Sequence, residues 1–367
     1  MYTNHGEKAN GIDDGKALIA MSGGVDSSMA AKLMLDRGFS CVGCTMKLYD
    51  GDNADKEQQK TCCSLNDVND ARRVCARLKI LHYVTDYREE FRKEVIDRFV
   101  SFYEQGMTPN PCIDCNNKLK FGTLFAKADE LGCRYIVTGH YAGILEENGV
   151  FRLKKAKDLT KDQSYFLYGI PQEKLSRILF PLGEYTKPEI RALADEAGFV
   201  NAAKHDSQDI CFVPEGDYAK VIREYTDRDY PPGDFIDSEG KKLGRHKGII
   251  CYTIGQRRGL GVPGTDRYYV SEIRTKDNTV VLSDNASLFS RDLTVKDLNW
   301  IEGKPPAEDF RCCVRIRYRH KEQPALVSVL SENEVRVTFD EPQRAITKGQ
   351  SAVFYDGDYV LGGGIIS

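Results

Sequence analysis

The sequence predicts an α/β fold in which a parallel-sheet domain is followed by smaller β-rich domains. Three observations support this prediction. Short apolar segments alternate with helix-like segments through the first half of the chain. After about residue 213 the helical periodicity fades, and short alternating segments separated by turn residues replace it. The chain has 367 residues, a length that suits two or three domains better than a single core.

The alternation begins at residues 17–21, which form a short apolar segment typical of a buried strand. Residues 27–37 are helix formers that end before Gly38, a residue favoured just after a helix. The remaining expected elements of this half are strands at residues 39–48, 81–85 and 135–137, and helices at residues 66–78, 87–103 and 121–131. Strands that alternate with helices form a parallel sheet, and ligands then bind beyond the carboxyl ends of the strands.

The predicted domain boundaries follow these changes in pattern. The expected units are a disordered tail at residues 1–15, an α/β domain at residues 16–213, a small β-rich central domain at residues 214–284 and a C-terminal β-barrel at residues 285–367.

The composition is ordinary for a globular protein, with 41% hydrophobic and 29% charged residues. No apolar run approaches the roughly 18 to 20 residues that cross a bilayer. The polar N-terminus lacks the apolar segment of a secretory signal. The twelve cysteines are scattered along the chain, so we expect thiols in a reducing cytoplasm and no membrane partner.

The net charge of −3 gives no global attraction for nucleic acids. Two local stretches, residues 241–247 and 311–321, contain several lysines and arginines and no acidic residue. Each stretch fits either an RNA-binding surface or a solvated strand face.

The most specific motif is Ser22-Gly23-Gly24-Val25-Asp26-Ser27-Ser28, which follows a predicted strand and opens a predicted helix. Two glycines let the backbone approach an anion, and amides at a helix start bind phosphate oxygens. Ser22 and Ser27 add hydroxyl groups. The Walker A pattern with its lysine is absent, which disfavours transfer of a terminal phosphate. The motif is similar to the PP-loop of ATP pyrophosphatases, which favours chemistry at the α-phosphate of ATP.

Two cysteine motifs supply further candidates. A proline-stiffened loop, Thr108-Pro109-Asn110-Pro111-Cys112-Ile113-Asp114-Cys115, presents a C-x-x-C pair that suits a metal site, a redox pair or a nucleophile. The second motif is Asp206-Ser207-Gln208-Asp209-Ile210-Cys211-Phe212, at the end of the α/β half. No second C-x-x-C is present, so a four-cysteine zinc site is poorly supported. The cysteines expected to be small core residues are Cys41, Cys44, Cys75, Cys133 and Cys251.

Together these segments resemble the tRNA-specific 2-thiouridylase family from about residue 17 to residue 366. The further segments that carry the resemblance are Thr138-Gly139-His140-Tyr141, Lys161-Asp162-Gln163-Ser164-Tyr165-Phe166-Leu167-Tyr168, Tyr252-Thr253-Ile254-Gly255-Gln256-Arg257-Arg258-Gly259-Leu260-Gly261 and Gly349-Gln350-Ser351-Ala352-Val353-Phe354-Tyr355. The resemblance implies a PP-loop ATP-binding catalytic domain and a tRNA-binding C-terminal barrel.

The resemblance also implies a mechanism. O2 of the wobble uridine attacks the α-phosphate of ATP, and sulfur from a cysteine persulfide then displaces AMP at C2. Cys211 would carry the persulfide and Cys115 would be the nucleophile that attacks it, either releasing sulfide or closing a disulfide. Mg²⁺ would offset charge on the leaving pyrophosphate. The implied partners are the tRNAs for lysine, glutamate and glutamine, and a persulfide sulfur-donor protein.

The resemblance assigns binding roles as well. The positions implied to contact ATP are Ala20, Met21, Ser22, Gly23, Gly24, Val25, Asp26, Ser27, Met46 and Gly139. The positions implied to contact tRNA are Asn110, Pro111, Cys112, His140, Lys161, Asp162, Gln163, Arg317, Tyr318 and Gln350. Asp26 is placed among the catalytic residues, and the aromatic residues at 165–168 are expected in the core.

The chain departs from the family at Cys112, where many members have aspartate. A carboxylate for proton transfer is lost, and a third thiol accompanies Cys115 and Cys211. Three such thiolates resemble the [4Fe-4S] sites of related thiolases. Two hypotheses follow, a persulfide relay and a cluster held by the three cysteines, of which the relay is preferred.

Two other functions remain as alternatives. One is a different adenylating PP-loop enzyme, which thiolates another tRNA base or amidates a small molecule, and which would not need Cys211. The other is an ATP-binding sulfur carrier or RNA-binding module without turnover, which would form no AMP.

Overall fold

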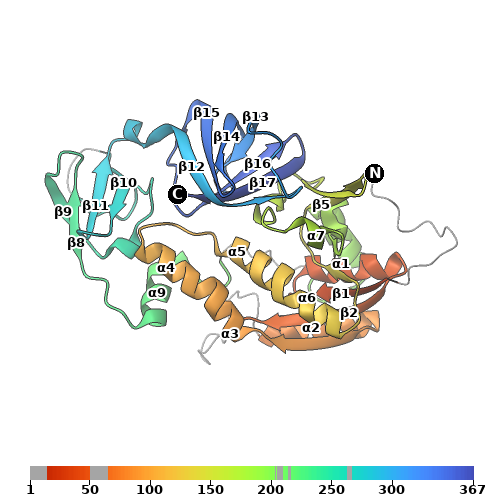
Figure 1. The fold of residues 1–367 in the computed structure, drawn as a ribbon. Coiled ribbons are helices and arrows are strands. Elements are labelled where there is room, and N and C mark those ends of the chain that lie inside the picture. Colours follow the sequence, from red (N-terminus) through yellow and green to blue (C-terminus); the bar gives the residue numbers. More distant parts are fainter. Residues whose placement is uncertain (1–14, 50–64, 203, 205–209, 214–215, 263–266) are drawn as a thin grey trace.

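The computed structural model describes residues 15–49, 65–202, 204, 210–213, 216–262 and 267–367. Residues 1–14, nearly all of the expected tail, lie outside this range, as do residues 206–209 of the second cysteine motif. The molecule has three parts (Figure 1): an α/β layer, a small β domain beside α4 and α9, and a barrel above the α/β layer. No helix in the described ranges has the length and apolar character needed to cross a membrane.

The α/β domain is built on a five-stranded sheet with the order β3-β2-β1-β4-β7, in which every pairing is parallel. Its strands are β1 (Lys16–Ala20), β2 (Ser40–Lys47), β3 (Leu81–Asp86), β4 (Tyr135–Val137) and β7 (Ile178–Leu179). Its longer helices are α1 (Val25–Asp36), α2 (Leu65–Leu78), α4 (Asp97–Glu104), α6 (Leu124–Glu130) and α8 (Lys187–Glu196). β1 has β2 on one side and β4 on the other, so the loops that follow β1 and β4 meet at the crevice where such sheets bind ligands.

Two expected helices are interrupted. The helix expected at residues 87–103 consists of α3 (Arg88–Phe91), a π-helical segment (Arg92–Ile96) and α4. Before α6, the helix α5 (Pro111–Asp114) continues into a π-helical segment (Cys115–Thr123), where Phe121 has a non-helical φ of −110°. π-Helical turns are common near functional sites, and here one begins at Cys115.

The structure also contains a β-hairpin that was not predicted from the first half of the sequence. β5 (Gly143–Glu147) and β6 (Val150–Lys154) pair antiparallel, and their turn places Asn148 and Gly149 at positive φ, as an Asn-Gly hairpin requires. β6 pairs with β17 of the barrel, Lys154 opposite Tyr359. The α/β domain therefore adds two strands to the sheet of the C-terminal domain.

The C-terminal domain is a closed antiparallel barrel with the order β12-β15-β14-β13-β16-β17, sealed by pairing of β17 with β12. Its strands are β12 (Phe289–Trp300), β13 (Asp309–Arg315), β14 (Gln323–Ser331), β15 (Glu334–Arg344), β16 (Ser351–Asp356) and β17 (Tyr359–Ile366). The central domain has α9 (Tyr218–Thr226) and a four-stranded sheet of β8 (Gly233–Ile236), β9 (Lys242–His246), β10 (Tyr269–Arg274) and β11 (Thr279–Ser283). The predicted fold class is confirmed.

Candidate active site

The loop between β1 and α1 is packed so closely that one residue within it and one residue beside it must be glycine. Gly23 has a φ of 77°, and a Cβ there would lie 2.3 Å from the backbone oxygen of Asp67. A Cβ on Gly139, which follows β4, would lie 2.7 Å from the backbone carbon of Asp26 and 2.8 Å from the nitrogen of Ser27. Gly139 therefore sets how closely the loop after β4 approaches the predicted nucleotide loop.

The two loop serines form a hydroxyl pair beneath the start of α1. The Ser27 hydroxyl donates to the backbone oxygen of Gly24 at 3.0 Å, and it accepts from the Ser22 amide at 3.2 Å. The two hydroxyl oxygens lie 3.3 Å apart. Gly24 is the N-cap residue of α1 and gives no side-chain cap, so the amides of the first turn are placed for an anion such as phosphate.

Asp26 is fixed by residues from two distant segments. The Lys187 ammonium group, at the first residue of α8, donates to both Asp26 carboxylate oxygens at 2.7 Å. The Tyr141 hydroxyl donates to Asp26 Oδ1 at 2.9 Å. The Lys187 side chain is only 7% exposed. An ion pair to a buried lysine, together with a hydroxyl donor, holds the partly exposed acid of the loop in one position.

The other predicted ATP-contact residues gather at the same edge of the sheet. Ala20 ends β1, and Met46 lies near the end of β2 with 8% of its surface exposed. Asn201 supports the loop from outside, because its amide donates to the Gly23 oxygen and to the Ser28 hydroxyl, each at 2.9 Å.

The segment at residues 108–115, here named the Cys112–Cys115 loop, is held by the barrel. It was expected to be an irregular loop, but Cys112 lies in α5 and Cys115 begins the π-helical segment. The Gln350 amide donates to the backbone oxygens of Thr108 at 2.8 Å and Pro109 at 3.3 Å. The Thr108 amide donates to the backbone oxygen of Lys348 at 2.8 Å. The predicted tRNA-contact residue Gln350 therefore positions the loop that carries the cysteines.

Asn110 and Pro111 then begin the short helix α5. The Asn110 side chain accepts from the Cys112 amide at 3.2 Å, and Pro111 occupies the first helical position, where its missing N–H has no cost. Cys112 is exposed and Cys115 is buried. Between them, Asp114 contacts Arg98 at 3.1 Å, and burial raises the pKa of Asp114 to about 6 despite the opposing charge of Arg98.

Cys211 lies in a short described segment at residues 210–213 and is half-buried. The Tyr49 hydroxyl donates to its backbone oxygen at 2.7 Å, and the Phe212 ring packs edge-on against Phe91 and Phe99. Cys115 belongs to the large hydrophobic core against which Cys211 packs. Within the described ranges, no three histidine, cysteine or acidic side chains are grouped as metal ligands.

The cysteines expected in the core behave largely as predicted. Cys41, Cys44, Cys75 and Cys133 are buried, whereas Cys251 is half-buried. Burial raises the pKa of Cys41 and of Cys75 to about 12, which leaves almost no thiolate at neutral pH. The exposure of Cys112 and the half-buried position of Cys211 distinguish them from the four buried thiols, though not from Cys251.

His140 and Asp162, both predicted to contact tRNA, are buried. His140 bonds to the Thr138 hydroxyl at 2.7 Å, and burial lowers its pKa well below the ordinary value. Asp162 accepts from the Ser164 hydroxyl at 2.8 Å and contacts Arg315 of the barrel at 3.5 Å. These contacts hold the protein together, so their predicted roles in tRNA binding remain predictions.

The other predicted tRNA-contact residues are more accessible. Lys161 and Gln163 are half-buried, and Gln163 accepts from the Tyr141 amide at 2.9 Å. In the barrel, Tyr318 packs on Phe166 with ring centroids 4.4 Å apart, and the Arg317 guanidinium donates to the backbone oxygen of Arg344 at 3.3 Å. Tyr165, Leu167 and Tyr168 are buried as expected.

The sequence reasoning missed Lys187, Tyr141 and Asn201. Lys187 had a detectable signal, because Thr186 and Glu189 form a capping box around it and a lysine at a helix N-terminus opposes the helix dipole. Such a lysine needs a carboxylate partner, which the fold supplies as Asp26.

Comparisons with known proteins cover nearly all of the chain. Three family models match it: a tRNA methyl transferase HUP domain at residues 15–215, a tRNA methyl transferase PRC-barrel domain at residues 219–284 and an aminomethyltransferase beta-barrel domain at residues 290–366. The tRNA-specific 2-thiouridylase MnmA of Acetivibrio thermocellus is 48% identical over 96% of this chain and 99% of its own length. The MnmA of Clostridioides difficile is 46% identical over 96% and 98%.

Solved structures match more weakly. A 4-thiouridine synthetase bound to RNA and ATP is 18% identical, covers 54% of this chain and 44% of its own, and gives a TM-score of 0.34. The U34-tRNA thiolase NcsA of Methanococcus maripaludis with its [4Fe-4S] cluster is 16% identical over 58% and 64%, also with a TM-score of 0.34.

Proposed function

Because this chain belongs to the family of tRNA-specific 2-thiouridylases, we propose that it uses ATP to replace O2 of the wobble uridine of tRNA with sulfur. It is an ATP-dependent transferase whose products are 2-thiouridine, AMP and pyrophosphate. The observation that carries the proposal is the loop at residues 22–28, whose free first-turn amides suit phosphate, in a chain that also has an exposed thiol at Cys112 and a half-buried thiol at Cys211.

In the first step, O2 of the uridine attacks the α-phosphorus of ATP, and the bond to pyrophosphate breaks. The backbone amides at the start of α1 and the hydroxyls of Ser22 and Ser27 would hold the phosphates. Asp26, fixed by Lys187 and Tyr141, would keep the loop in this conformation. Mg²⁺ bound mainly by the phosphates would neutralise charge on the leaving group, and such sites need only one or two protein carboxylates.

In the second step, the terminal sulfur of a persulfide on Cys211 bonds to C2, and the bond from C2 to the AMP oxygen breaks. Cys115 attacks the inner sulfur, which leaves a disulfide between Cys115 and Cys211 and passes the outer sulfur to the base. A thiol reductant then restores both cysteines. The half-buried position of Cys211 suits a group that must receive sulfur from a donor protein.

The experiment is incubation of the purified chain with ATP, unmodified tRNA and a persulfide donor, followed by mass analysis of nucleosides. We expect 2-thiouridine and an equal amount of AMP. Cys211→Ser should abolish the product, whereas Cys251→Ser, at another half-buried cysteine, should retain it. Activity that survives Cys211→Ser on another base or a small molecule would instead identify a different adenylating enzyme.

A [4Fe-4S] cluster on Cys112, Cys115 and Cys211 is the alternative sulfur site. The described side chains do not form a three-ligand group, so the relay is the proposal here and no step is derived through a cluster. Full activity of iron-free protein would support the relay. Loss of activity on iron removal, together with a visible absorbance band that disappears in Cys112→Ala, would support the cluster.

The finer assignments belong to the same proposal. We propose the tRNAs for lysine, glutamate and glutamine as substrates, a persulfide-carrying protein as the sulfur donor, and the cytoplasm as the location. Transcripts of these three tRNAs, compared with a tRNA that has no wobble uridine, would test the substrate set.

A further inference from the structure

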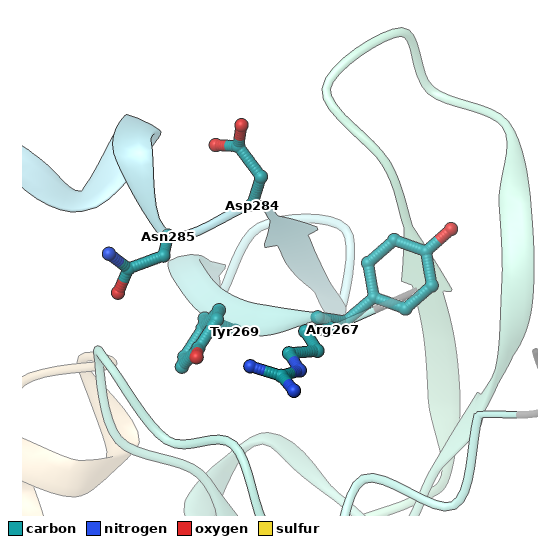
Figure 2. A pocket seen from close by; sticks show the side chains of 5 residues that line it. Arg267, Tyr269, Asp284 and Asn285 are labelled. Carbon is teal, nitrogen blue, oxygen red and sulfur yellow. The ribbon is translucent and has the colours of Figure 1, made fainter. Parts of the chain in front are cut away.

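A pocket of about 600 Å³ opens where the central domain meets the barrel, away from the nucleotide loop. Arg267, Tyr268 and Tyr269 line it from the start of β10, and Asp284 and Asn285 line it from the connection that follows β11. Figure 2 shows Arg267 just before β10 and Tyr269 at its start, with Asp284 and Asn285 on the connection that follows the neighbouring strand β11. The proposed reaction assigns this pocket no role.

An arginine of the barrel contacts two of the residues that line this pocket. The Arg344 guanidinium, at the end of β15, lies 5.0 Å from the centre of the Tyr269 ring. Its Nε donates to the Asn285 side-chain oxygen at 2.8 Å. Two lining residues therefore orient Arg344, which lowers the entropy that a ligand must remove on binding.

Three arginines in or near the pocket differ in their ion pairing from two other arginines of the barrel. Elsewhere in the barrel, Arg311 pairs with Asp340, and Arg315 pairs with Asp162 and Glu322. Among the described residues, no carboxylate forms an ion pair with Arg267, Arg317 or Arg344. Burial, and then the charge of Arg344, lowers the pKa of Arg317, so the two guanidinium groups repel each other. An anionic ligand would remove this repulsion.

The pocket also has an acceptor. Asp284 Oδ1 accepts from the Ser287 amide at 2.9 Å and from the Ser287 hydroxyl at 2.7 Å, and the hydroxyl bond, as the larger effect, lowers the pKa of Asp284. An ionised carboxylate repels a simple anion but accepts from a ribose hydroxyl or a base amine. The combination of ring, guanidinium and carboxylate thus fits a nucleotide better than a free phosphate.

We propose that this pocket binds one unstacked nucleotide of the tRNA, separate from the target uridine. Tyr269 contacts the base, Arg267 and Arg344 contact the phosphate, and Asp284 accepts from a ribose hydroxyl or base amine. A predicted tRNA-contact residue lies nearby, because Arg317 donates to the backbone oxygen of Arg344, whose guanidinium contacts Tyr269. This inference depends on the proposed function in that the bound RNA is the tRNA substrate.

The test compares the binding of unmodified full-length tRNA to Tyr269→Ala, Arg267→Ala and the parent chain over a range of salt concentrations. We expect Tyr269→Ala to weaken binding about tenfold, the effect of losing one stacked base. Arg267→Ala should reduce the slope of log Kd against log salt by about 0.7 to 0.9, the value for one phosphate contact. Arg274→Ala, an exposed arginine of the same strand that pairs with Glu272, is the matched control and should change neither quantity.

The outcomes separate this inference from the proposed function. Unchanged affinity and salt slope in both pocket variants would overturn the pocket, whether or not the parent makes 2-thiouridine. Weakened tRNA binding in the variants would support the pocket even if the parent makes no 2-thiouridine. Slower sulfur transfer from the donor protein with unchanged tRNA affinity would overturn it in favour of a protein partner.

Discussion

The nucleotide loop and the Cys112–Cys115 loop are held by different parts of the molecule. Gly139, Lys187 and Asn201 hold the nucleotide loop, and all three belong to the α/β domain. The cysteine loop instead receives its anchoring hydrogen bonds from residues 348–350 of the barrel. The comparison teaches that activation of the base and delivery of sulfur rest on separate structural supports, so mutations should affect them separately.

The largest expected effect is on the nucleotide loop. Gly139→Ala places a Cβ against the backbone of Asp26 and Ser27, which cannot move without displacing the phosphate site. We expect ATP-dependent AMP formation to fall roughly 100-fold, since a displacement of about 1 Å of reacting groups has effects of that order. The control is Gly244→Ala, where the new Cβ meets nothing closer than 3.8 Å. Equal activity of the two variants would show that the close approach of Gly139 has no functional importance.

The second prediction concerns the ion pair between the buried Lys187 and Asp26 of that loop. Lys187→Met leaves Asp26 with the Tyr141 hydroxyl but without its cation, and we expect the free energy of unfolding to fall by about 2–3 kcal/mol. Lys157→Met is the control, because Lys157 pairs with Glu189 at the exposed surface and such pairs contribute about 0–1 kcal/mol. Denaturant titration measures both variants. Adding Asp26→Asn to Lys187→Met should recover part of the loss, and a purely additive further loss would contradict the pairing.

The third prediction tests whether the barrel holds the Cys112–Cys115 loop in place. Gln350→Ala removes the amide that binds the Thr108 and Pro109 carbonyls, while the backbone bond from Thr108 to Lys348 remains. We expect the rate of sulfur transfer to fall about tenfold, because the segment loses roughly one hydrogen-bonded contact. ATP binding should be unchanged. The rate at which a thiol reagent labels Cys112 without tRNA should change as well. Unchanged labelling with weakened tRNA binding would mean that Gln350 acts by touching RNA.

These differences also show which features were accessible from the sequence. The nucleotide loop was predictable because its glycines, serines and acid lie within seven consecutive residues, between a recognisable strand and helix. The buried aromatic residues near Tyr165 were predictable from their apolar character. Contacts between distant segments were not: Lys187 reaches Asp26 across 161 positions, and Gln350 reaches Thr108 across 242.

The sequence pattern around a residue also could not predict which polar side chains are buried. His140 lies in a motif that resembles a functional one, yet the rings of Phe121 and Phe180 pack around it. Asp162 precedes an aromatic segment, and its sequence position suggests an exposed acid. The structure instead shows that it contacts Arg315 and so joins the α/β domain to the barrel. Whether a polar side chain faces RNA or a neighbouring domain depends on docking between domains, which has no signature in a single segment.

The smallest expected effect concerns Asp114, which lies inside the cysteine loop. Its pKa in the folded protein is about 6, whereas an exposed aspartate titrates near 4. The folded state therefore binds an extra proton between these values, and stability due to Asp114 is present below about pH 4 and is lost as the pH rises through about 6. Asp114→Asn cannot lose a proton, so its stability relative to the parent should rise over this interval.

The measurement is thermal stability of the parent and Asp114→Asn at several pH values between about 4 and 7. The relative slope should reach at most about 1.4 kcal/mol per pH unit, the limit for one proton. Asp36→Asn is the control, because Asp36 is exposed and pairs with Lys32 on the surface of α1. A relative stability that stays flat or falls with pH would mean that Asp114 is ionised at little cost, because Arg98 then fully offsets its burial. In that case the carboxylate beside Cys115 would already be charged at about pH 5, where a carboxyl with a pKa of about 6 is mostly protonated.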